Sequence, residues 1–461
     1  MKNKILVLFF LFVALQSQAQ IEGYWKGEID LGVQKLETAF DIKAAENGYS
    51  ATFDVPAQGA FNIPVDEVSF QDSQLQLKMN AMDASYSGTL KDSVIEGTFT
   101  QRGMTFPLNL AKAEKNDQQK ARPQDPQPPF DYQIEEVTFV NPKEGNTLAG
   151  TLTIPEGEGP FPAMVLVSGS GQQNRDEELL GHKPFLVLSD YLARHGIAVL
   201  RYDDRGVGGS KGEVENATTL DFADDAEAAF NLLRKQKRID TRHVGIIGHS
   251  EGGLIAPIVA SRNGKVNFVV LLAGQGTTGA DILLQQNERI YQLDSVPQPL
   301  IDRRLELLRS LYAVMDTLPV DNYQPFTIAL CDKYSEGLTA DQRKSIGLRR
   351  GDAIGLATQM ALPWMRTFVK LDNSSYLSRL RCPILAVNGD KDCQVLPVNL
   401  QAISDATQGR ADIRLMPGLN HLMQHCRTGA PSEYMLIDET MAPEVLQTVA
   451  DWILQVSKTK K

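Results

Sequence analysis

Apolar and polar positions follow two different patterns along this chain. From residue 21 to about residue 110 they alternate in short runs such as LETAFDIK and ASYSGTL, which are separated by Gly, Asn, Asp and Ser. Alternation with a period of two, interrupted by turn residues every ~8 to 12 positions, predicts antiparallel strands. We therefore expect residues 20–112 to form a small antiparallel β-domain that curls into a barrel or half-barrel.

The second pattern begins at Asp131. Strand-length apolar runs such as AMVLVS, HVGIIG and PILAVNG alternate there with helix-length amphipathic segments. This alternation predicts a mostly parallel sheet covered on both faces, so we assign residues 131–461 to the α/β class. Between about residues 275 and 378 only helical periodicity remains, which predicts a helical cap inserted between two late strands. The polar, proline-rich residues 113–130 are interpreted as a linker, because they cannot bury enough apolar surface to fold.

The N-terminus has the layout of a secretory signal. Two lysines precede an apolar run from Ile5 to Leu15, and Ser17-Gln18-Ala19 forms a small-residue cleavage pattern. The run is too short to span a bilayer core of ~30 Å as a helix. We expect residues 1–19 to be removed, which leaves a secreted or periplasmic protein with no membrane insertion after cleavage.

Charge and cysteine content narrow the choice of partners. The formal net charge of −11 argues against nucleic acids and anionic membrane surfaces, because both would repel the protein. Four cysteines permit disulfides in an exported protein, but a chain of this length does not need them, and free thiols are the favoured interpretation. A disulfide between Cys393 and Cys426 stays an alternative. The β-domain carries no constellation of charged residues, and packing, substrate positioning or formation of a homodimer are the roles expected for it.

The pattern G-x-S-x-G, which surrounds many nucleophilic serines, occurs twice, around Ser250 and around Ser210. Such a nucleophile needs a strand that delivers it to a strained turn and a helix that follows at once. Ser250 lies between an apolar run at 243–248 and a helical segment at 251–262. Ser210 follows a polar loop, and no helix start comes after it. We predict that Ser250 is the nucleophile and that Ser210 is a chance match in a flexible loop.

A nucleophilic serine requires a base and an acid, which follow it in the chain order Ser, Asp or Glu, His. Only His421 and His425 lie downstream of Ser250. His421 comes directly after the last predicted strand and is favoured, with His425 as the alternative. The acid is expected after the strand PILAVN, where Asp392 is favoured over Asp390. The histidines before Ser250 are assigned to the core or the surface, and His249 is expected to shape the turn.

Two backbone N–H groups are candidates for holding the negative oxygen that develops during acyl transfer. The N–H of Glu251 lies at a helix N-terminus, and that of Ser170 lies in the loop Ser168-Gly169-Ser170 after the strand AMVLVS. A phosphate-binding loop is the alternative for the second segment, but it lacks the third glycine and the lysine of such motifs. We expect no cofactor and no metal. Trp364, at the end of the cap, is proposed as a wall of the substrate pocket.

Together these residues resemble a known family over residues 131 to about 457. The matching segments are the pentapeptide around Ser250, the loop at 203–206, Pro363-Trp364, the segment at 389–392 and the segment at 420–424. They are similar to those of bacterial α/β-hydrolase esterases of the serine aminopeptidase S33 type, some of which have an extra N-terminal domain. Many relatives have His-Gly where this chain has Ser168-Gly169. The opening Gly23-Tyr24-Trp25 is similar to the start of lipocalin-like barrels.

The resemblance and the ordered Ser, Asp and His residues lead to one principal hypothesis. It is a serine carboxylesterase that hydrolyses short-chain acyl esters through Ser250, His421 and Asp392 and an acyl-enzyme. The alternative is an aminopeptidase or acyl-peptide hydrolase, in which Glu177 or Glu178 would bind a peptide amine. The preceding residues, Arg175 and Asp176, are expected to form an ion pair with a structural role. The third hypothesis is a ligand-binding protein with a vestigial hydrolase domain.

Overall fold

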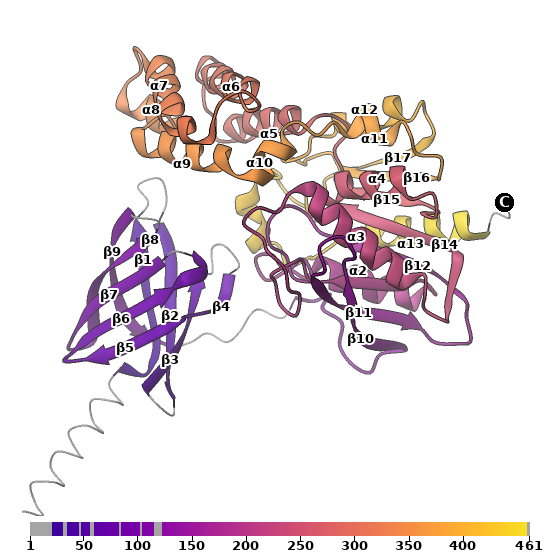
Figure 1. The fold of residues 1–461 in the computed structure, drawn as a ribbon, viewed down its shortest axis with the longest axis horizontal. Helices are drawn as coiled ribbons and strands as arrows, with labels where there is room; N and C mark the ends of the chain where they lie inside the picture. The colour runs from indigo at the N-terminus through magenta and orange to yellow at the C-terminus, as the bar shows by residue number, and fades with distance from the viewer. Residues whose placement is uncertain are drawn as a thin grey trace, which may run out of the picture. The chain divides into compact units, whose positions relative to one another are not determined.

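The computed structural model describes residues 21–30, 35–45, 48–55, 60–82, 84–101, 104–114 and 122–458. The predicted signal peptide, residues 1–19, lies outside these ranges. The chain divides into two compact units, with the boundary between residues 121 and 122, and each is described by itself (Figure 1).

The first unit is a curled antiparallel sheet (Figure 1). Among the described residues it contains nine strands in the spatial order β4-β3-β2-β1-β9-β8-β7-β6-β5. Their bounds are β1 (Gly23–Asp30), β2 (Lys35–Ala45), β3 (Gly48–Val55), β4 (Ala60–Pro64), β5 (Glu67–Gln71), β6 (Gln74–Met79), β7 (Ala84–Lys91), β8 (Val94–Gln101) and β9 (Met104–Ala113), with a short 3-10 helix η2 (Asn80–Met82). The period-two alternation buries one face of each strand, as β6 illustrates, and the predicted antiparallel β-domain is confirmed.

Aromatic side chains fill the interior of this sheet. Trp25, Phe40, Phe53 and Tyr86 are fully buried, and the rings of Phe40 and Phe53 stack with centroids 4.7 Å apart. The Tyr86 hydroxyl donates to the carbonyl oxygens of Ile95 or Leu108, each 3.2 Å away. Burial of these large rings stabilises the unit, because the free energy gained scales with the apolar area removed from water.

The second unit is built around an eight-stranded sheet in the order β10-β11-β13-β12-β14-β15-β16-β17. Strands β10 and β11 are antiparallel to their neighbours, and the strands from β13 to β17 are parallel. Their bounds are β10 (Tyr132–Val140), β11 (Thr147–Pro155), β12 (Phe161–Val167), β13 (Ala198–Tyr202), β14 (Ile239–His249), β15 (Val269–Leu272), β16 (Ile384–Gly389) and β17 (Ala411–Met416). The central strands β13, β15 and β16 are buried at every position, which explains their continuous apolar runs.

Helices cover both faces of this sheet. One face packs against α3 (Thr219–Leu233), α4 (Gly252–Arg262) and α12 (Val398–Ala406), and the other against α2 (Pro184–Arg194) and α13 (Pro443–Lys458). The predicted α/β class with a mostly parallel sheet is therefore confirmed. No helix among the described residues is long and apolar enough to cross a membrane.

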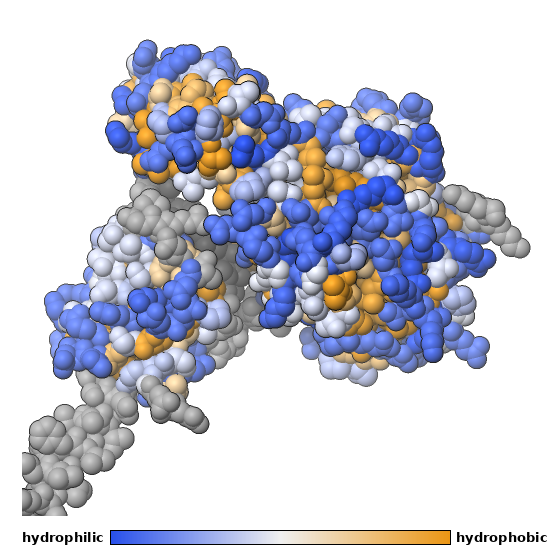
Figure 2. All heavy atoms as spheres, viewed as in Figure 1, coloured by the Kyte–Doolittle hydropathy of each residue, from blue (hydrophilic) through white to orange (hydrophobic). Residues whose placement is uncertain are grey.

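The predicted cap insertion lies between β15 and β16 as a separate group of helices (Figure 1). Its elements are α5 (Gly279–Leu293), α6 (Gln298–Ala313), η3 (Val320–Asn322), α7 (Tyr323–Ser335), α8 (Ala340–Ser345), α9 (Arg350–Ala361), α10 (Pro363–Phe368) and α11 (Asn373–Leu377). The cap has its own buried core, which includes Leu307, Leu311, Tyr323 and Met360. On the face drawn in Figure 2, apolar side chains gather over the cap helices, whereas much of the sheet domain's surface is hydrophilic.

Part of the predicted linker is ordered. The guanidinium of Arg122 is buried and donates to the carbonyl oxygen of Ile437 at 2.5 Å. The Gln124 amide donates to the carbonyl oxygen of Met441 at 2.7 Å and accepts from the N–H of Thr440 at 2.6 Å. These polar contacts hold residues 122–124 against a loop near the 3-10 helix η4 (Pro431–Leu436) without apolar burial. A prediction that rests on apolar content cannot detect such polar contacts.

Candidate active site

Ser250 occupies a strained turn between β14 and α4. Its φ angle is 52°, in the left-handed region that an L-residue other than glycine rarely adopts. A Cβ atom on Gly248 would lie 1.9 Å from the carbonyl oxygen of Gly252, and one on Gly252 would lie 2.1 Å from that of Val167. Both glycines are therefore required for the turn to close. This is the strand, turn and helix geometry of a nucleophile elbow.

His421 and Asp392 form a buried pair. Nδ1 of His421 lies 2.9 Å from Oδ2 of Asp392, and the two residues are 4% and 2% exposed. The other oxygen of Asp392 accepts from the backbone N–H groups of Gln394 at 2.8 Å and Val395 at 3.0 Å. Because these three contacts leave little freedom, the carboxylate orients the imidazole so that Nδ1 carries the proton and Nε2 can accept one.

The alternative acid and base lie elsewhere. The carboxylate of Asp390 accepts from the backbone N–H of Gly418 at 2.7 Å and is exposed. The ring of His425 is half exposed and contacts the carboxylates of Glu439 and Glu444, each at 3.0 Å. The structure thus brings His421 together with Asp392, whereas Asp390 and His425 have partners on the surface.

Ser210 is not in a flexible loop, and that part of the sequence interpretation was wrong. It is 3% exposed, its hydroxyl donates to the carbonyl oxygen of Asp203 at 2.6 Å, and it accepts from the N–H of Ala149 at 2.9 Å. A hydroxyl with both roles filled inside the protein holds its loop to the sheet. This occupation leaves Ser210 unavailable as a nucleophile.

The Ser250 hydroxyl has no hydrogen-bond partner among the described residues, and Nε2 of His421 is also unpaired there. Their two loops are nevertheless joined, because Nε2 of His249 lies 3.0 Å from the carbonyl oxygen of His421. Hydrogen bonds between nucleophile and base are often long in free enzymes and tighten when substrate binds. The turn that carries Ser250 and the pair of His421 and Asp392 are therefore connected through the ring of His249.

The loop after β12 runs directly beside the nucleophile. A Cβ atom on Gly169 would lie 3.2 Å from Cβ of Ser250, so only glycine gives this approach without displacement. The N–H of Gly169 donates to Oε1 of Glu177 at 2.7 Å. Within residues 122–458, the N–H groups of Ser170 and Glu251 donate to no protein acceptor. These two predicted oxyanion donors are free to receive a substrate oxygen.

The side chain of Ser168, at the start of the loop after β12, has a defined partner. Its hydroxyl donates to the carboxyl group of Asp204, whose oxygens lie 3.0 and 3.1 Å away. Asp204 also accepts from the backbone N–H of Gln173 at 3.0 Å. Burial raises the pKa of Asp204 to about 8, against the lowering effect of these hydrogen bonds. The carboxyl group of Asp204, largely neutral at pH 7, is therefore hydrogen-bonded to two residues of the loop after β12, Ser168 and Gln173.

Glu177, one of the two acids that the alternative peptidase hypothesis offered for binding a peptide amine, is not open to substrate. It is 5% exposed, and its Oε1 contacts both the N–H of Gly169 and Nδ1 of His249, at 2.7 and 2.9 Å. The cavity that it lines beside Phe185 and Met423 measures about 10 Å³, room for one water molecule. Glu177 thus connects the oxyanion loop to the residue before the nucleophile.

The cap is attached to the elbow through Trp364. Its indole Nε1–H donates to Oε1 of Glu251 at 2.8 Å, and the hydroxyl of Thr219 donates to the same oxygen at 2.6 Å. Burial raises the pKa of Glu251 in spite of these two donors. The Trp364 ring stacks on Phe368, with centroids 5.0 Å apart. The side chain of Glu251, which immediately precedes α4, therefore links the nucleophile turn directly to the cap.

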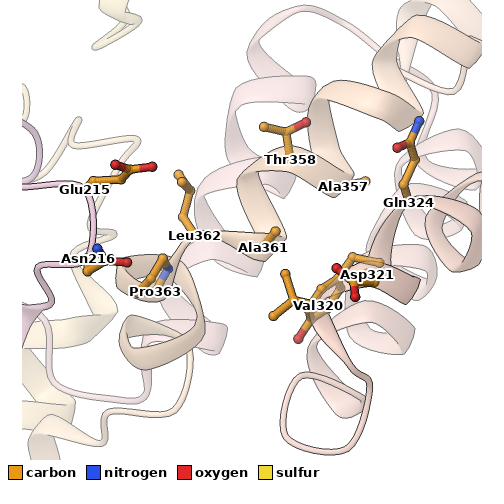
Figure 3. Close-up of a pocket in the computed structure, with 11 residues that line it drawn as sticks. Glu215, Asn216, Val320, Asp321, Gln324, Ala357, Thr358, Ala361, Leu362 and Pro363 are labelled. Atoms are coloured by element: carbon orange, nitrogen blue, oxygen red, sulfur yellow. The ribbon is translucent and has the colours of Figure 1, made fainter. Parts of the chain in front are cut away.

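A cavity of about 510 Å³ lies next to this link. Figure 3 shows that Leu362 and Pro363 from the cap and Glu215 and Asn216 from the loop before α3 line it together with Val320. Trp364 is not among the lining residues, although it follows Pro363 directly. The volume falls in the range that small-molecule sites occupy.

The loop at 203–206 has a structural role. Arg175 binds Asp203 through a bidentate ion pair, with Nη2 and Oδ2 2.8 Å apart, and Asp176 pairs with Arg201. The expected ion pair between Arg175 and Asp176 was therefore wrong, because each has a partner on a strand or strand end. Arg205 forms a third such contact, with Asp225 at 2.7 Å. All four cysteines are free thiols.

Fold and site together define the class. A mostly parallel sheet with a helical insertion after β15, a strained serine elbow after β14, and an acid and a histidine after β16 and β17 are the marks of an α/β-hydrolase. A family model described as serine aminopeptidase, S33, matches residues 184–425, more than half of the chain. The chain belongs to this family, and the resemblance inferred from its sequence is confirmed.

Relatives and solved structures are similar at low identity. Esterase EstD of Thermotoga maritima is 27% identical over 317 residues, which cover 67% of this chain and 66% of that protein, just under two thirds of its length. The α/β hydrolase GrgF of Penicillium sp. sh18 is 15% identical, with a TM-score of 0.44 over 70% of this chain and 98% of the other. Est1E of Butyrivibrio proteoclasticus, solved with ferulic acid, is 16% identical, with a TM-score of 0.41 over 70% and 100% of the two chains.

Proposed function

We propose that this protein is a serine carboxylesterase that hydrolyses short-chain acyl esters. The observation that carries the proposal is the buried pair of His421 and Asp392, joined through His249 to a strained serine turn. Family membership and the similarity to a protein named as an esterase support it.

In the proposed mechanism, Oγ of Ser250 attacks the ester carbonyl carbon while Nε2 of His421 takes the hydroxyl proton. Asp392 stabilises the resulting imidazolium. The carbonyl oxygen becomes an anion, which the N–H groups of Ser170 and Glu251 stabilise. The tetrahedral intermediate collapses, the alcohol leaves with the proton from His421, and an acyl-enzyme remains. Water then repeats the sequence as nucleophile, and the acid and free Ser250 are released.

The cap is proposed to set the size of the substrate. Trp364, anchored to Glu251, holds this part of the cap against the turn that carries Ser250. The neighbouring cavity is lined by apolar side chains, among them Val320 at 45% and Leu362 at 39% exposure, and by the acids Glu215 and Asp321. Its apolar side chains suit an ester with short apolar groups, and its acids disfavour an anionic substrate.

The alternative function is an aminopeptidase or acyl-peptide hydrolase, which the family's description favours. A free peptide amine requires an accessible carboxylate near the nucleophile, and Glu177 does not supply one because it is buried and bonded. The matched comparison is turnover of aminoacyl p-nitroanilides and of p-nitrophenyl butyrate by the same preparation. Anilide rates equal to the ester rates would favour the peptidase.

The nucleophile is tested by Ser250→Ala, with Ser210→Ala as the second serine of the same sequence pattern. We expect hydrolysis of p-nitrophenyl acetate and butyrate to fall by ~10⁴-fold or more in the first variant, because the acyl-enzyme cannot form. Ser210→Ala should keep its rate as long as its thermal unfolding shows a folded protein. A fluorophosphonate probe should label wild type and not Ser250→Ala. Equal esterase rates in wild type and Ser250→Ala, or no labelling of wild type, would contradict the proposal.

A further inference from the structure

His249, the residue before the nucleophile, has an acceptor at both ring nitrogens. Nε2 lies 3.0 Å from the carbonyl oxygen of His421, and Nδ1 lies 2.9 Å from Oε1 of Glu177. A carbonyl oxygen has no proton to donate, so Nε2 of His249 must carry one. A neutral imidazole has a single N–H, and Nδ1 would then face the carboxylate without a proton between them.

The same oxygen of Glu177 also accepts from the N–H of Gly169 at 2.7 Å. A second proton on His249 gives each donor an acceptor. The two ring N–H groups and the backbone N–H then face the carbonyl oxygen of His421 and Oε1 of Glu177, while Oε2 of Glu177 has no hydrogen-bond partner among the described residues. Burial by itself would lower the pKa of His249, but the charge of Glu177 and the hydrogen bonds to Glu177 and His421 outweigh it, so the pKa is raised.

We propose that His249 is a constantly protonated positioning residue, whose imidazolium pairs with Glu177 and holds the nucleophile turn, the oxyanion loop and the His421 loop in register. This inference rests on the proposed function for its kinetic consequence, but not for the charge of His249. The oxyanion loop and the nucleophile turn approach each other closely, because a Cβ atom on Gly169 would lie within 3.7 Å of atoms of Ser250, Glu177 and His249.

During the proposed reaction His421 becomes protonated beside the protonated His249, and nearby carboxylates balance these two positive charges. Glu177 and the more distant Asp392 both favour its protonated form, and the ring of His421 lies with its centroid 4.9 Å away. With His421 neutral, these four groups sum to one negative charge. When His421 takes the serine proton, the sum is zero. A neutral His249 would leave two uncompensated carboxylates at rest, which are costly to bury.

The pH dependence follows from the direction of this shift. His249 must stay charged, so activity falls once pH exceeds its raised pKa, because the hydrogen bond to Glu177 or to His421 is then lost. Removing the charge of Glu177 withdraws a contribution that raises the pKa of His249. The alkaline limb of kcat/KM should therefore move to lower pH in Glu177→Gln.

The charge is tested on the full-length wild-type protein labelled with ¹⁵N-histidine, independently of any esterase activity. At pH 7, above the ordinary histidine pKa of about 6.5, we expect one buried histidine with both ring nitrogens protonated. Its signals should be absent in His249→Asn and present in His425→Asn. Signals of a neutral His249 at pH 7 in wild type would overturn the inference, whatever the protein hydrolyses.

The positioning role is tested by pH profiles of p-nitrophenyl butyrate hydrolysis. In Glu177→Gln we expect the alkaline limb of kcat/KM to shift by one pH unit or more. Glu439→Gln is the matched control, because Glu439 pairs with His425 at 3.0 Å on the surface, and its profile should coincide with that of wild type. A Glu177→Gln profile that also coincides with wild type would overturn the role. If Glu177→Gln does not fold, the labelled wild-type protein decides the charge of His249.

Discussion

At the scale of single residues, four acids near the elbow have different hydrogen-bond partners. Asp392 and Glu177 each face a histidine ring at 2.9 Å. Asp204 faces a hydroxyl and a backbone N–H, and Glu251 faces a hydroxyl and an indole N–H. Removal from water raises the pKa values of Asp204 and Glu251, and the hydrogen bonds from these neutral donors lower them by less.

Asp204 provides a prediction of stability against pH. Its pKa of about 8 in the folded state exceeds the ordinary value of 3.8, so the folded protein binds more protons between these values. The free energy of unfolding therefore falls as pH rises from about 4 to about 8 and then levels off. Asp204→Asn keeps an oxygen acceptor without a charge. We expect its melting temperature to decrease less than that of wild type between pH 5 and pH 8.

The measurement is thermal unfolding at several pH values across that window. Asp390→Asn is the control, since Asp390 is an exposed acid that accepts from one backbone N–H. Its curve should run parallel to that of wild type. A parallel curve for Asp204→Asn as well would show that the carboxyl group is already ionised in the folded protein.

At the scale of elements, a side-chain contact joins the cap to the turn that carries Ser250. Trp364 at the start of α10 binds Glu251, which immediately precedes α4. The helical periodicity of the cap predicted its existence and approximate bounds. It could not predict this contact, because Trp364 and Glu251 are separated by more than a hundred residues and come from independent amphipathic patterns.

Trp364→Phe removes the indole donor and keeps an aromatic ring. A net hydrogen bond to a charged group contributes about 1.5–3 kcal/mol, so a looser cap should raise KM for p-nitrophenyl butyrate by roughly ten-fold or more. The value of kcat should change less, because Ser250, His421 and Asp392 are not altered. Thr219→Ser, which keeps the second donor to Glu251, should behave like wild type. An unchanged KM in Trp364→Phe would mean that the contact does not hold the cap in solution.

At the scale of the whole molecule, the β-domain and the hydrolase domain were both expected from their periodicities. All of residues 113–130 were interpreted as a linker. Within this segment, however, Arg122 and Gln124 are held by hydrogen bonds to the hydrolase domain. The four cysteines are free, in agreement with the favoured interpretation and in contrast to the alternative disulfide between Cys393 and Cys426.

Export is the prediction at this scale, and it rests on the pattern of residues 1–19. We propose that cleavage after Ala19 gives a secreted or periplasmic protein, because a short apolar run with small residues at its end directs secretion. Expression with a native N-terminus should yield protein that begins at Gln20, by intact mass or N-terminal sequencing of the extracytoplasmic fraction. A chain that lacks residues 2–19 should stay in the cytoplasm. Uncleaved protein in the membrane fraction would contradict the proposal.

The sequence by itself determined the elements and the order of the principal chemical groups. Strand and helix periods reflect which side chains face a core, and this information is local. The elbow was also readable, because its glycines and the helix that follows lie within a few residues of Ser250. Chain order after particular strands then led to His421 and to the neighbouring acids Asp390 and Asp392. The resemblance to enzymes of this fold favoured Asp392, which the structure brings within 2.9 Å of His421.

Only the tertiary structure decided which polar groups are buried and what they face. Glu177, Asp204 and His249 lie in three separate segments, and the motifs around Asp204 and His249 do not show which groups these side chains face. Folding brings Glu177 to His249 and Asp204 to Ser168. Because these groups are removed from water, the pKa values of His249 and Asp204 depend on burial and on these partners. Ser210, read as a flexible loop residue, is fully bonded inside the protein for the same reason. Desolvation is a property of the whole fold, so no local pattern can express it.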